Sequence, residues 1–150
     1  MDFTVNRTSE IMQRALDGLS ARHKAITANI ANAQTADYIR SDVIFEDQLQ
    51  NIVEMENLKE NVRIQNSKLP LSINFNQADV LLKSNSFEGY SPDTVIDTDS
   101  PIISNGNNVN LEVEMVELSK NASKYNVISQ LESKYFSRLL EQIRSAGNIQ

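Results

Sequence analysis

The segment "MQRALDGLSARHKAITANIANA", residues 12–33, decides the fold of this chain because its apolar residues keep a regular helical spacing. Successive members of this stripe lie three or four positions apart, which is typical of a helix that packs against another helix along a narrow seam. We expect the helix to begin near Thr8, a residue type that caps helices. The members of the stripe are Met12, Leu16, Leu19, His23, Ile26, Ile30 and Ala33.

A second stripe of the same kind lies near the C-terminus. The preceding "SNGNNVN", residues 104–110, contains an Asn-Gly turn signal, and either Asn108 or Asn110 can cap a following helix. We therefore predict two long terminal helices that pack as an antiparallel, coiled-coil-like pair. In the simpler interpretation, the two stripes pack against each other within one molecule and form its core. In the alternative, they pack against other molecules. The second stripe begins with Leu111, Met115, Leu118, Ala122 and Tyr125, and it continues at an ordinary helical period through Ile128, Leu131, Tyr135, Leu139 and Ile143.

The middle of the chain differs from both ends. Residues 34–108 carry five basic and twelve acidic groups, whereas the two ends are close to neutral. We expect a short helix from Asp42 to Val53, strand-like alternation at 62–64 and 71–75, and a loop over 83–108. The fold class is mainly α with a small, irregular, β-containing middle. The expected organisation is an N-terminal helix and turn (1–40), an acidic middle (41–108) and a C-terminal helix (109–150).

Composition excludes several classes of function. The chain has no Cys, so disulfides and thiolate chemistry are absent. A net charge of -6 and the lack of a basic stripe argue against nucleic acid as a partner. No apolar run approaches the roughly 20 residues that cross a bilayer, so we expect no direct membrane insertion. The N-terminal "MDFTVNRTSE" lacks the charged and apolar regions of a cleaved signal peptide.

Residues that could perform chemistry are sparse, and we expect no catalytic, cofactor-binding or metal site. His23 lies on the helical stripe without a second His or a Cys to join it. Asp93, Asp97 and Asp99 are close in sequence, but their spacing does not match a calcium loop. We interpret these three acids as solvated loop residues. A carboxylate-based hydrolase would require them to converge in a pocket.

Two long segments resemble bacterial flagellar rod proteins. Residues 19–49, "LSARHKAITANIANAQTADYIRSDVIFEDQL", contain the N-I-A-N-A run that leads into T-P-G-Y in that family. Residues 106–139, "GNNVNLEVEMVELSKNASKYNVISQLESKYFSRL", contain its G-N-x-V, E-M and Y-N elements. The chain has Thr-Ala-Asp-Tyr at 35–38 in place of T-P-G-Y, and Asn-Gly-Asn at 105–107 in place of D-G-N. Because Asp tolerates left-handed backbone, we expect a turn near Asp37 that is softer or displaced.

The resemblance implies a structural function. Flagellar rod proteins leave the cell through the flagellum-specific type III export channel and polymerise helically in the rod of the basal body, which spans the periplasm and transmits torque. The implied partners are copies of this chain, other flagellar rod proteins, ring and junction proteins of the basal body, and the export apparatus. No cofactor is implied. The short middle segment is similar to that of the shorter rod subunits.

The same resemblance suggests a subunit interface formed by both ends of the chain. In this hypothesis, Asn29 and Asn32 are interface amides that bond to an adjoining subunit. The alternatives are a soluble helical adaptor or export chaperone, and the hydrolase considered above. The candidate interface residues are Leu16, Leu19, Ile26, Asn29, Ile30, Asn32, Ala33, Thr35, Tyr38, Gly106, Asn107, Val109, Leu111, Met115, Leu118, Tyr125 and Asn126.

Overall fold

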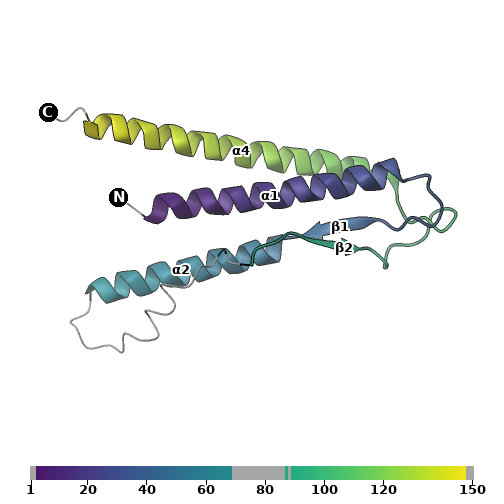
Figure 1. Ribbon diagram of the computed structural model, residues 1–150, viewed down its shortest axis with the longest axis horizontal. Helices are drawn as coiled ribbons and strands as arrows, with labels where there is room; N and C mark the ends of the chain where they lie inside the picture. Colours follow the sequence, from purple (N-terminus) through teal and green to yellow (C-terminus); the bar gives the residue numbers. More distant parts are fainter. Residues whose placement is uncertain (1–2, 69–86, 88, 148–150) are drawn as a thin grey trace.

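The computed structural model describes residues 3–68, 87 and 89–147. This part of the chain is mainly helical and carries one two-stranded antiparallel sheet (Figure 1), which confirms the expected fold class. The elements in chain order are α1 (Phe3–Ala31), β1 (Ser41–Ile44), α2 (Glu46–Lys68), β2 (Asp93–Ile96) and α4 (Leu111–Gly147).

The two long terminal helices run antiparallel, as the sequence predicts. In Figure 1, α1 lies between α4 and α2, and the start of α1 is at the same end as the last turns of α4. Leu19 and Ile26 of the N-terminal stripe are buried, at 2% exposure each, whereas His23 is exposed. The expected start at Thr8 is wrong, because α1 already begins at Phe3 and Thr8 lies inside it.

The first part of the C-terminal stripe lies mostly outside the contact with α1, so the prediction of one shared intramolecular core is wrong for Leu111, Met115, Ala122 and Tyr125. The continuation of the stripe meets the prediction in part, because Ile128 packs against the core and Tyr135 and Leu139 are half-buried. The buried residues of α4 are Glu114 and Asn121, seven positions apart on a neighbouring line of the helix. Their side chains hydrogen-bond to Asn29 and to the carbonyl oxygen of Leu19, and these bonds set the rotation of α4. Of the five residues that begin the stripe, only Leu118 is half-buried, and the other four are exposed.

The second helix begins later and extends further than predicted. Asp42 lies in β1 rather than in a helix, and α2 continues from Glu46 to Lys68. The strand-like alternation expected at 62–64 is therefore wrong. Residues 56–68, "ENLKENVRIQNSK", contain many residues with high helix propensity, which outweighs a two-residue alternation. An ion pair between Lys59 Nζ and Glu56 Oε1, at 3.0 Å, further stabilises the helix, because these two residues lie about one turn apart on its surface.

The middle segment contains a short β-ribbon where a loop was expected. β1 pairs antiparallel with β2, so that Ser41 lies opposite Ile96 and Ile44 opposite Asp93. The β-branched run Thr-Val-Ile at 94–96 favours this strand, and its pairing partner lies about fifty positions away. The loop prediction is wrong at these residues. The strand expected at 71–75 lies outside the described residues.

The ribbon is anchored to α1 by a ring that fills a notch. A Cβ atom at Gly18 would lie 2.4 Å from two carbons of the Phe45 ring, so only glycine leaves room for it. The guanidinium of Arg22 lies 4.8 Å from the centre of the same ring, and its Nε donates to the carbonyl oxygen of Val43 at 3.1 Å. Phe45 and Val43 join Leu19 in the buried core. The packing of Phe45 against Gly18 therefore fixes the position of the ribbon relative to α1.

Candidate functional site

The end of α1, the ribbon and the start of α4 meet in a polar junction centred on Asn29. The Asn29 side chain is fully buried. Its Oδ1 accepts hydrogen bonds from the Ser41 N–H at 3.0 Å and the Tyr38 hydroxyl at 3.3 Å. Its Nδ2 donates to the Ser41 carbonyl at 2.8 Å and to Glu114 Oε2 at 3.1 Å. All of its hydrogen-bonding capacity is therefore used within the chain.

Arg40 ties three segments of the junction together. Its Nε donates to Glu114 Oε1 at 2.8 Å, and its Nη1 donates to Asp97 Oδ2 at 2.6 Å. The Glu114 side chain is only 1% exposed, and a carboxylate so deeply buried requires a paired charge and hydrogen bonds. Burial alone would lower the pKa of Arg40, but its hydrogen bonds to Asp97 and Glu114 outweigh burial and raise it. These hydrogen bonds hold the ribbon against α4.

Asp97 is a structural acid of this junction, so its interpretation as a solvated loop residue is wrong. Its carboxylate accepts hydrogen bonds from the Ser100 hydroxyl at 2.7 Å and from the N–H groups of Asp99 and Ser100 at 3.0 Å each. The hydrogen bonds from Ser100 and Arg40 hold the pKa of Asp97 well below its usual range. This sequence-adjacent set of donors forms a local turn that presents the carboxylate to Arg40.

The three acids considered for hydrolysis do not share a site. Asp93 accepts a hydrogen bond from Gln48 Nε2 at 2.8 Å, whereas Asp97 bonds to Arg40. Among residues 3–68, 87 and 89–147, no group of three His, Asp or Glu side chains could hold a metal ion. Within the same ranges, no helix is long and apolar enough to cross a membrane.

Asn107 completes the C-terminal end of α1. Its Nδ2 donates to the carbonyl oxygens of Asn32 at 2.9 Å and Thr35 at 2.8 Å, at a helix end where carbonyls lack helical partners. Its Oδ1 accepts from the Val109 N–H at 2.7 Å. Asn32 stays within its own turn, because its Nδ2 donates to the Ala28 carbonyl at 2.9 Å. Asn107 and Val109 are both buried, so this contact belongs to the interior of the junction.

Two tight turns from the two family-like segments dock on each other. Asp37 has a left-handed φ of 56°, and its N–H donates to the Asn105 carbonyl at 2.9 Å. Asn105 and Gly106 have φ values of 46° and 77°, as in a two-residue type I′ turn. A Cβ at Gly106 would lie 2.0 Å from Asp37 Oδ1. Asp37 thus adopts the left-handed conformation at the position where the family has glycine.

Asn110, rather than Asn108, caps α4. Its Oδ1 accepts from the N–H groups of Glu112 at 3.0 Å and Val113 at 3.3 Å, which have no partner within the helix. Asn108 serves the junction instead: its Oδ1 accepts from the Arg40 N–H at 2.7 Å. Its Nδ2 donates to the Asp97 carbonyl, also at 2.7 Å. The two asparagines therefore divide the capping and docking roles.

A long apolar face of α4 is left uncovered. We call it the α4 stripe; it follows three- and four-residue steps from Leu111 to Tyr125 and again from Phe136 to Ile143, and its two parts together span about 48 Å. Met115 is 59% exposed and Leu140 is 55% exposed. Exposed apolar side chains gathered on one face of a helix are typical of a protein contact site. The stripe consists of Leu111, Met115, Leu118, Ala122, Tyr125, Phe136, Leu140 and Ile143.

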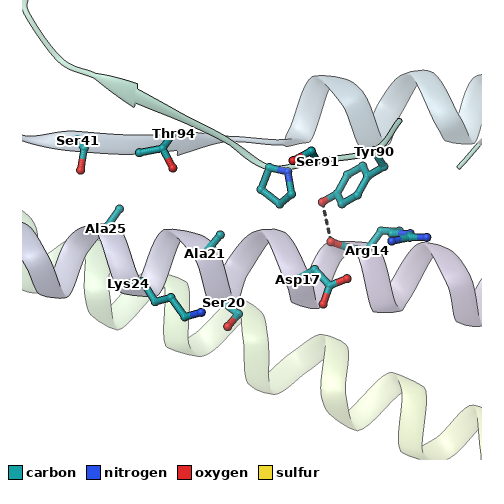
Figure 2. A pocket seen from close by; sticks show the side chains of 11 residues that line it. Arg14, Asp17, Ser20, Ala21, Lys24, Ala25, Ser41, Tyr90, Ser91 and Thr94 are labelled. Atoms are coloured by element: carbon teal, nitrogen blue, oxygen red, sulfur yellow. Dashed lines mark hydrogen bonds between the residues drawn. The ribbon is translucent and has the colours of Figure 1, made fainter. Parts of the chain in front are cut away.

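A second surface feature is a cleft of about 620 Å³ between α1 and the segment that leads into β2 (Figure 2). The Tyr90 hydroxyl closes one end by donating to the Arg14 carbonyl at 2.6 Å. Burial and the neighbouring charge of Asp17 raise the pKa of Tyr90. Arg14, Asp17 and Lys24 line the cleft together with several hydroxyl groups. This mixture of charges contains no set of ligands for a metal or cofactor.

The candidate interface residues separate into three groups in the structure. Most motif residues meet in the junction, where Thr35 is exposed and Tyr38 half-buried. Leu111, Met115, Tyr125 and Asn126 are exposed on α4, and Leu118 is half-buried. Sequence reasoning missed Arg40 and Glu114, and it gave Asp97 and Asn108 roles other than the ones they have in the junction. The residues on α1 that are buried or half-buried are Leu16, Leu19, Ile26, Asn29 and Ile30. Asn32 and Ala33, in the turn after α1, are half-buried, as is Gly106, and Asn107 and Val109 are buried in the junction.

Comparison with known proteins extends the resemblance over most of the chain. The chain is 29% identical over 133 residues to the flagellar basal body rod protein FlgB of Borreliella burgdorferi, covering 89% of this chain and 93% of that protein. It is 28% identical over 127 residues to the protein of the same name from Borrelia hermsii, covering 85% and 88%. No family model matches the chain. The similarity to flagellar rod proteins indicated by the two terminal segments is thus confirmed.

Proposed function

We propose that this chain is a structural subunit of the flagellar basal-body rod, at its proximal end. It polymerises helically through its terminal helices and transmits torque. Its similarity to two flagellar basal body rod proteins over more than four fifths of its length supports the rod assignment. Its neighbours are copies of itself, other rod proteins and the ring and junction proteins of the basal body. The flagellar export apparatus carries it to the rod.

The α4 stripe is the observation that carries this proposal. Leu111, Phe136 and Ile143 are 47%, 43% and 51% exposed, although a helix normally buries such a row against another element. Burial of these side chains against neighbouring subunits would supply the free energy of assembly. The row lies on a different line of α4 from Glu114 and Asn121, so α1 and a neighbour can contact the helix together.

The polar junction supports the same function by fixing the geometry of the helical pair. Glu114 is bonded both to Asn29 on α1 and to Arg40 next to β1, which sets the register of α4. A subunit that transmits torque requires such a register, because sliding between its helices would absorb the applied force. Buried, hydrogen-bonded charges favour one register over its neighbours, since any shift leaves them unpaired.

The test uses cells whose only copy of this protein carries one substitution. Met115→Asp and Leu140→Asp place a charge on the stripe without touching the junction. Ser123→Asp introduces the same charge elsewhere on the exposed surface of α4 and serves as the matched control. We expect the first two variants to be exported but to form no rods and not to swim, and the control to swim normally. Secretion is measured separately from rod formation in isolated basal bodies.

Two results would contradict the proposal. If both stripe variants swam normally, the α4 stripe would not be needed for rod assembly. A purified chain that stays the same monomer or dimer at all concentrations, and is absent from isolated basal bodies, would indicate the soluble adaptor or export chaperone instead. The hydrolase alternative would require Asp97→Asn to abolish a measurable hydrolytic activity while leaving the fold unchanged.

A further inference from the structure

The turn at 104–107 contains the single Asn-Gly pair of this sequence. Asn105 and Gly106 form its two-residue loop, with φ values of 46° and 77°. The Asn107 N–H donates to the Ser104 carbonyl oxygen at 2.7 Å and closes the loop. Asn105 is exposed, so water reaches its side-chain amide. The loop therefore presents an accessible amide directly before a glycine nitrogen.

The amide and the nitrogen are both free of hydrogen bonds. Within the described part of the chain, no hydrogen bond involves the Asn105 side-chain amide or the Gly106 N–H. Gly106 has no Cβ, so its nitrogen is less shielded than that of any other residue type. By contrast, the side chains of Asn29, Asn107 and Asn108 are buried and hydrogen-bonded. Asn105 thus combines exposure, a free amide and an unshielded neighbouring nitrogen.

These groups can react with water as the only other reactant. The Gly106 nitrogen attacks Asn105 Cγ and gives up its proton, and the bond from Cγ to Nδ2 breaks, so that ammonia leaves. Water then opens the five-membered imide. Opening at Cγ leaves aspartate at position 105, whereas opening at the backbone carbonyl leaves isoaspartate, in which the chain continues through the side chain. Either product replaces a neutral amide with a carboxylate, which is a covalent change of charge.

The docked turn opposes this reaction. The Asp37 N–H donates to the Asn105 carbonyl oxygen at 2.9 Å, which restricts rotation about the Cα–C bond that ring closure must turn. Asn107 strengthens the same docking, because its Nδ2 donates to the carbonyl oxygens of Asn32 and Thr35. Ring closure therefore requires the turn to leave Asp37, and the rate of the reaction measures how often it does so.

The product meets a like charge at the docking position. Asp37 Oδ1 lies so close to Gly106 that it leaves no room for a Cβ there. Among the described residues, no cation pairs with the Asp37 carboxylate. A second carboxylate on the residue before Gly106 would therefore be repelled by the first.

We propose that Asn105 is a deamidation site of this chain, and that its charged product docks less firmly on Asp37. The reaction then works in one direction: the turn leaves Asp37, the amide is lost, and the new carboxylate opposes the return of the turn. The same turn positions Asn107 on the carbonyl oxygens at the end of α1. Deamidation therefore loosens the contact between the two terminal segments.

The first test follows the purified full-length chain during incubation at neutral pH. Peptide mass spectrometry measures the fraction of each asparagine that has gained about one mass unit, and an isoaspartate-specific methyltransferase labels the second product. We expect Asn105 to react about tenfold faster than Asn126, which is also exposed but precedes the β-branched Val127. Equal rates at the two positions, or no reaction at Asn105, would overturn the proposal.

The second test asks whether docking controls the rate. Asn107→Ala removes the hydrogen bonds to the end of α1 and leaves the Asn-Gly pair unchanged. We expect Asn105 to react several-fold faster in this variant, toward the rate of the wild-type chain unfolded in urea. Asn126→Ala is the matched control and should leave the rate unchanged. If Asn105 reacted at the wild-type rate in a folded Asn107→Ala chain, docking would not protect it.

The third test isolates the effect of the product charge. Asn105→Asp should lower the melting temperature by about 2 °C, because it adds a carboxylate beside Asp37. The shift should disappear when Asp37→Asn is already present, since asparagine also tolerates left-handed backbone but carries no charge. Wild-type chain that has deamidated, separated by anion exchange, should melt below the unreacted chain. Equal shifts for Asn105→Asp in both backgrounds would overturn the role of Asp37.

Discussion

Asn29 of α1 and Glu114 of α4 contact each other across 85 positions of sequence, with 3.1 Å between Asn29 Nδ2 and Glu114 Oε2. Neither side chain is more than 1% exposed. An amide and a carboxylate thus occupy the centre of a helix pair in which apolar residues are the rule. The contact explains why α1 carries amides beside its apolar stripe: one of them holds the ribbon and α4 in register.

Replacement of Asn29 should lower the stability of the chain strongly. Asn29→Ala removes the buried hydrogen bonds that the Asn29 side chain makes with the Ser41 backbone and with Glu114. We therefore expect the free energy of unfolding to fall by about 3 kcal/mol. Urea unfolding of the full chain measures it. The exposed Asn126→Ala is the control and should change the unfolding free energy by less than about 0.5 kcal/mol. A similar small change for Asn29→Ala would show that the junction contributes little.

Arg40 and Glu114 should behave as a coupled pair. Arg40→Met leaves the buried Glu114 carboxylate without a paired charge and should cost about 3 to 5 kcal/mol. Glu114→Leu should cost less, because Arg40 keeps its ion pair with Asp97. The double variant should be less destabilised than the sum of the two, because no buried charge is left between them. A double-mutant cycle from urea unfolding measures the coupling. Additive losses would mean that the two residues act separately despite the 2.8 Å contact.

Asp97 should confer a pH dependence on stability. Its hydrogen bonds from Ser100 and Arg40 hold its pKa in the folded chain below the value in the unfolded chain. The unfolded chain therefore binds more protons in acid, and this contribution is present above about pH 4 and is lost as pH falls below it. Asp97→Asn should cost about 1 to 2 kcal/mol at pH 7, and this difference should shrink between pH 4 and pH 2.

Asp99→Asn provides the comparison for Asp97. Asp99 is exposed and close by in the same turn, so its substitution should shift the unfolding free energy by less than about 0.5 kcal/mol at any of these pH values. The measurement is thermal or urea unfolding of the three proteins across the pH series. If the unfolding free energies of the wild type and Asp97→Asn changed in parallel with pH, Asp97 would be a solvated loop residue after all.

Gly18→Ala should destabilise the chain, although alanine favours a helix by about 1 kcal/mol over glycine. The new Cβ would lie 2.4 Å from the Phe45 ring, so we expect a net loss of about 1 to 3 kcal/mol. Phe45→Leu provides a smaller side chain, so the double variant Gly18→Ala with Phe45→Leu should regain part of the lost stability. Gly147→Ala meets no atom within 4 Å and should be neutral or slightly stabilising. If Gly18→Ala raised the melting temperature, the Phe45 ring would not require a glycine at position 18.

The sequence by itself determined the features that depend on neighbours along the chain. The spacing of Leu19 and Ile26 identified the buried line of α1, because helical periodicity places such residues on one face whatever they contact. The Asn-Gly pair indicated the turn at 104–107, and the asparagines before α4 indicated a cap. The two terminal segments were sufficient to recognise the similarity to flagellar rod proteins.

Only the tertiary structure decided which face of α4 turns toward α1. The apolar spacing from Leu111 to Tyr125 is as regular as that of α1, but Glu114 and Asn121 occupy the contact because each finds a hydrogen-bonding partner on α1. The ribbon and the role of Asp97 also depend on distant partners: the hydrogen bond between Arg40 and Asp97 spans 57 positions. Such pairings carry no local period, since they arise when separate elements meet and buried polar groups must be satisfied.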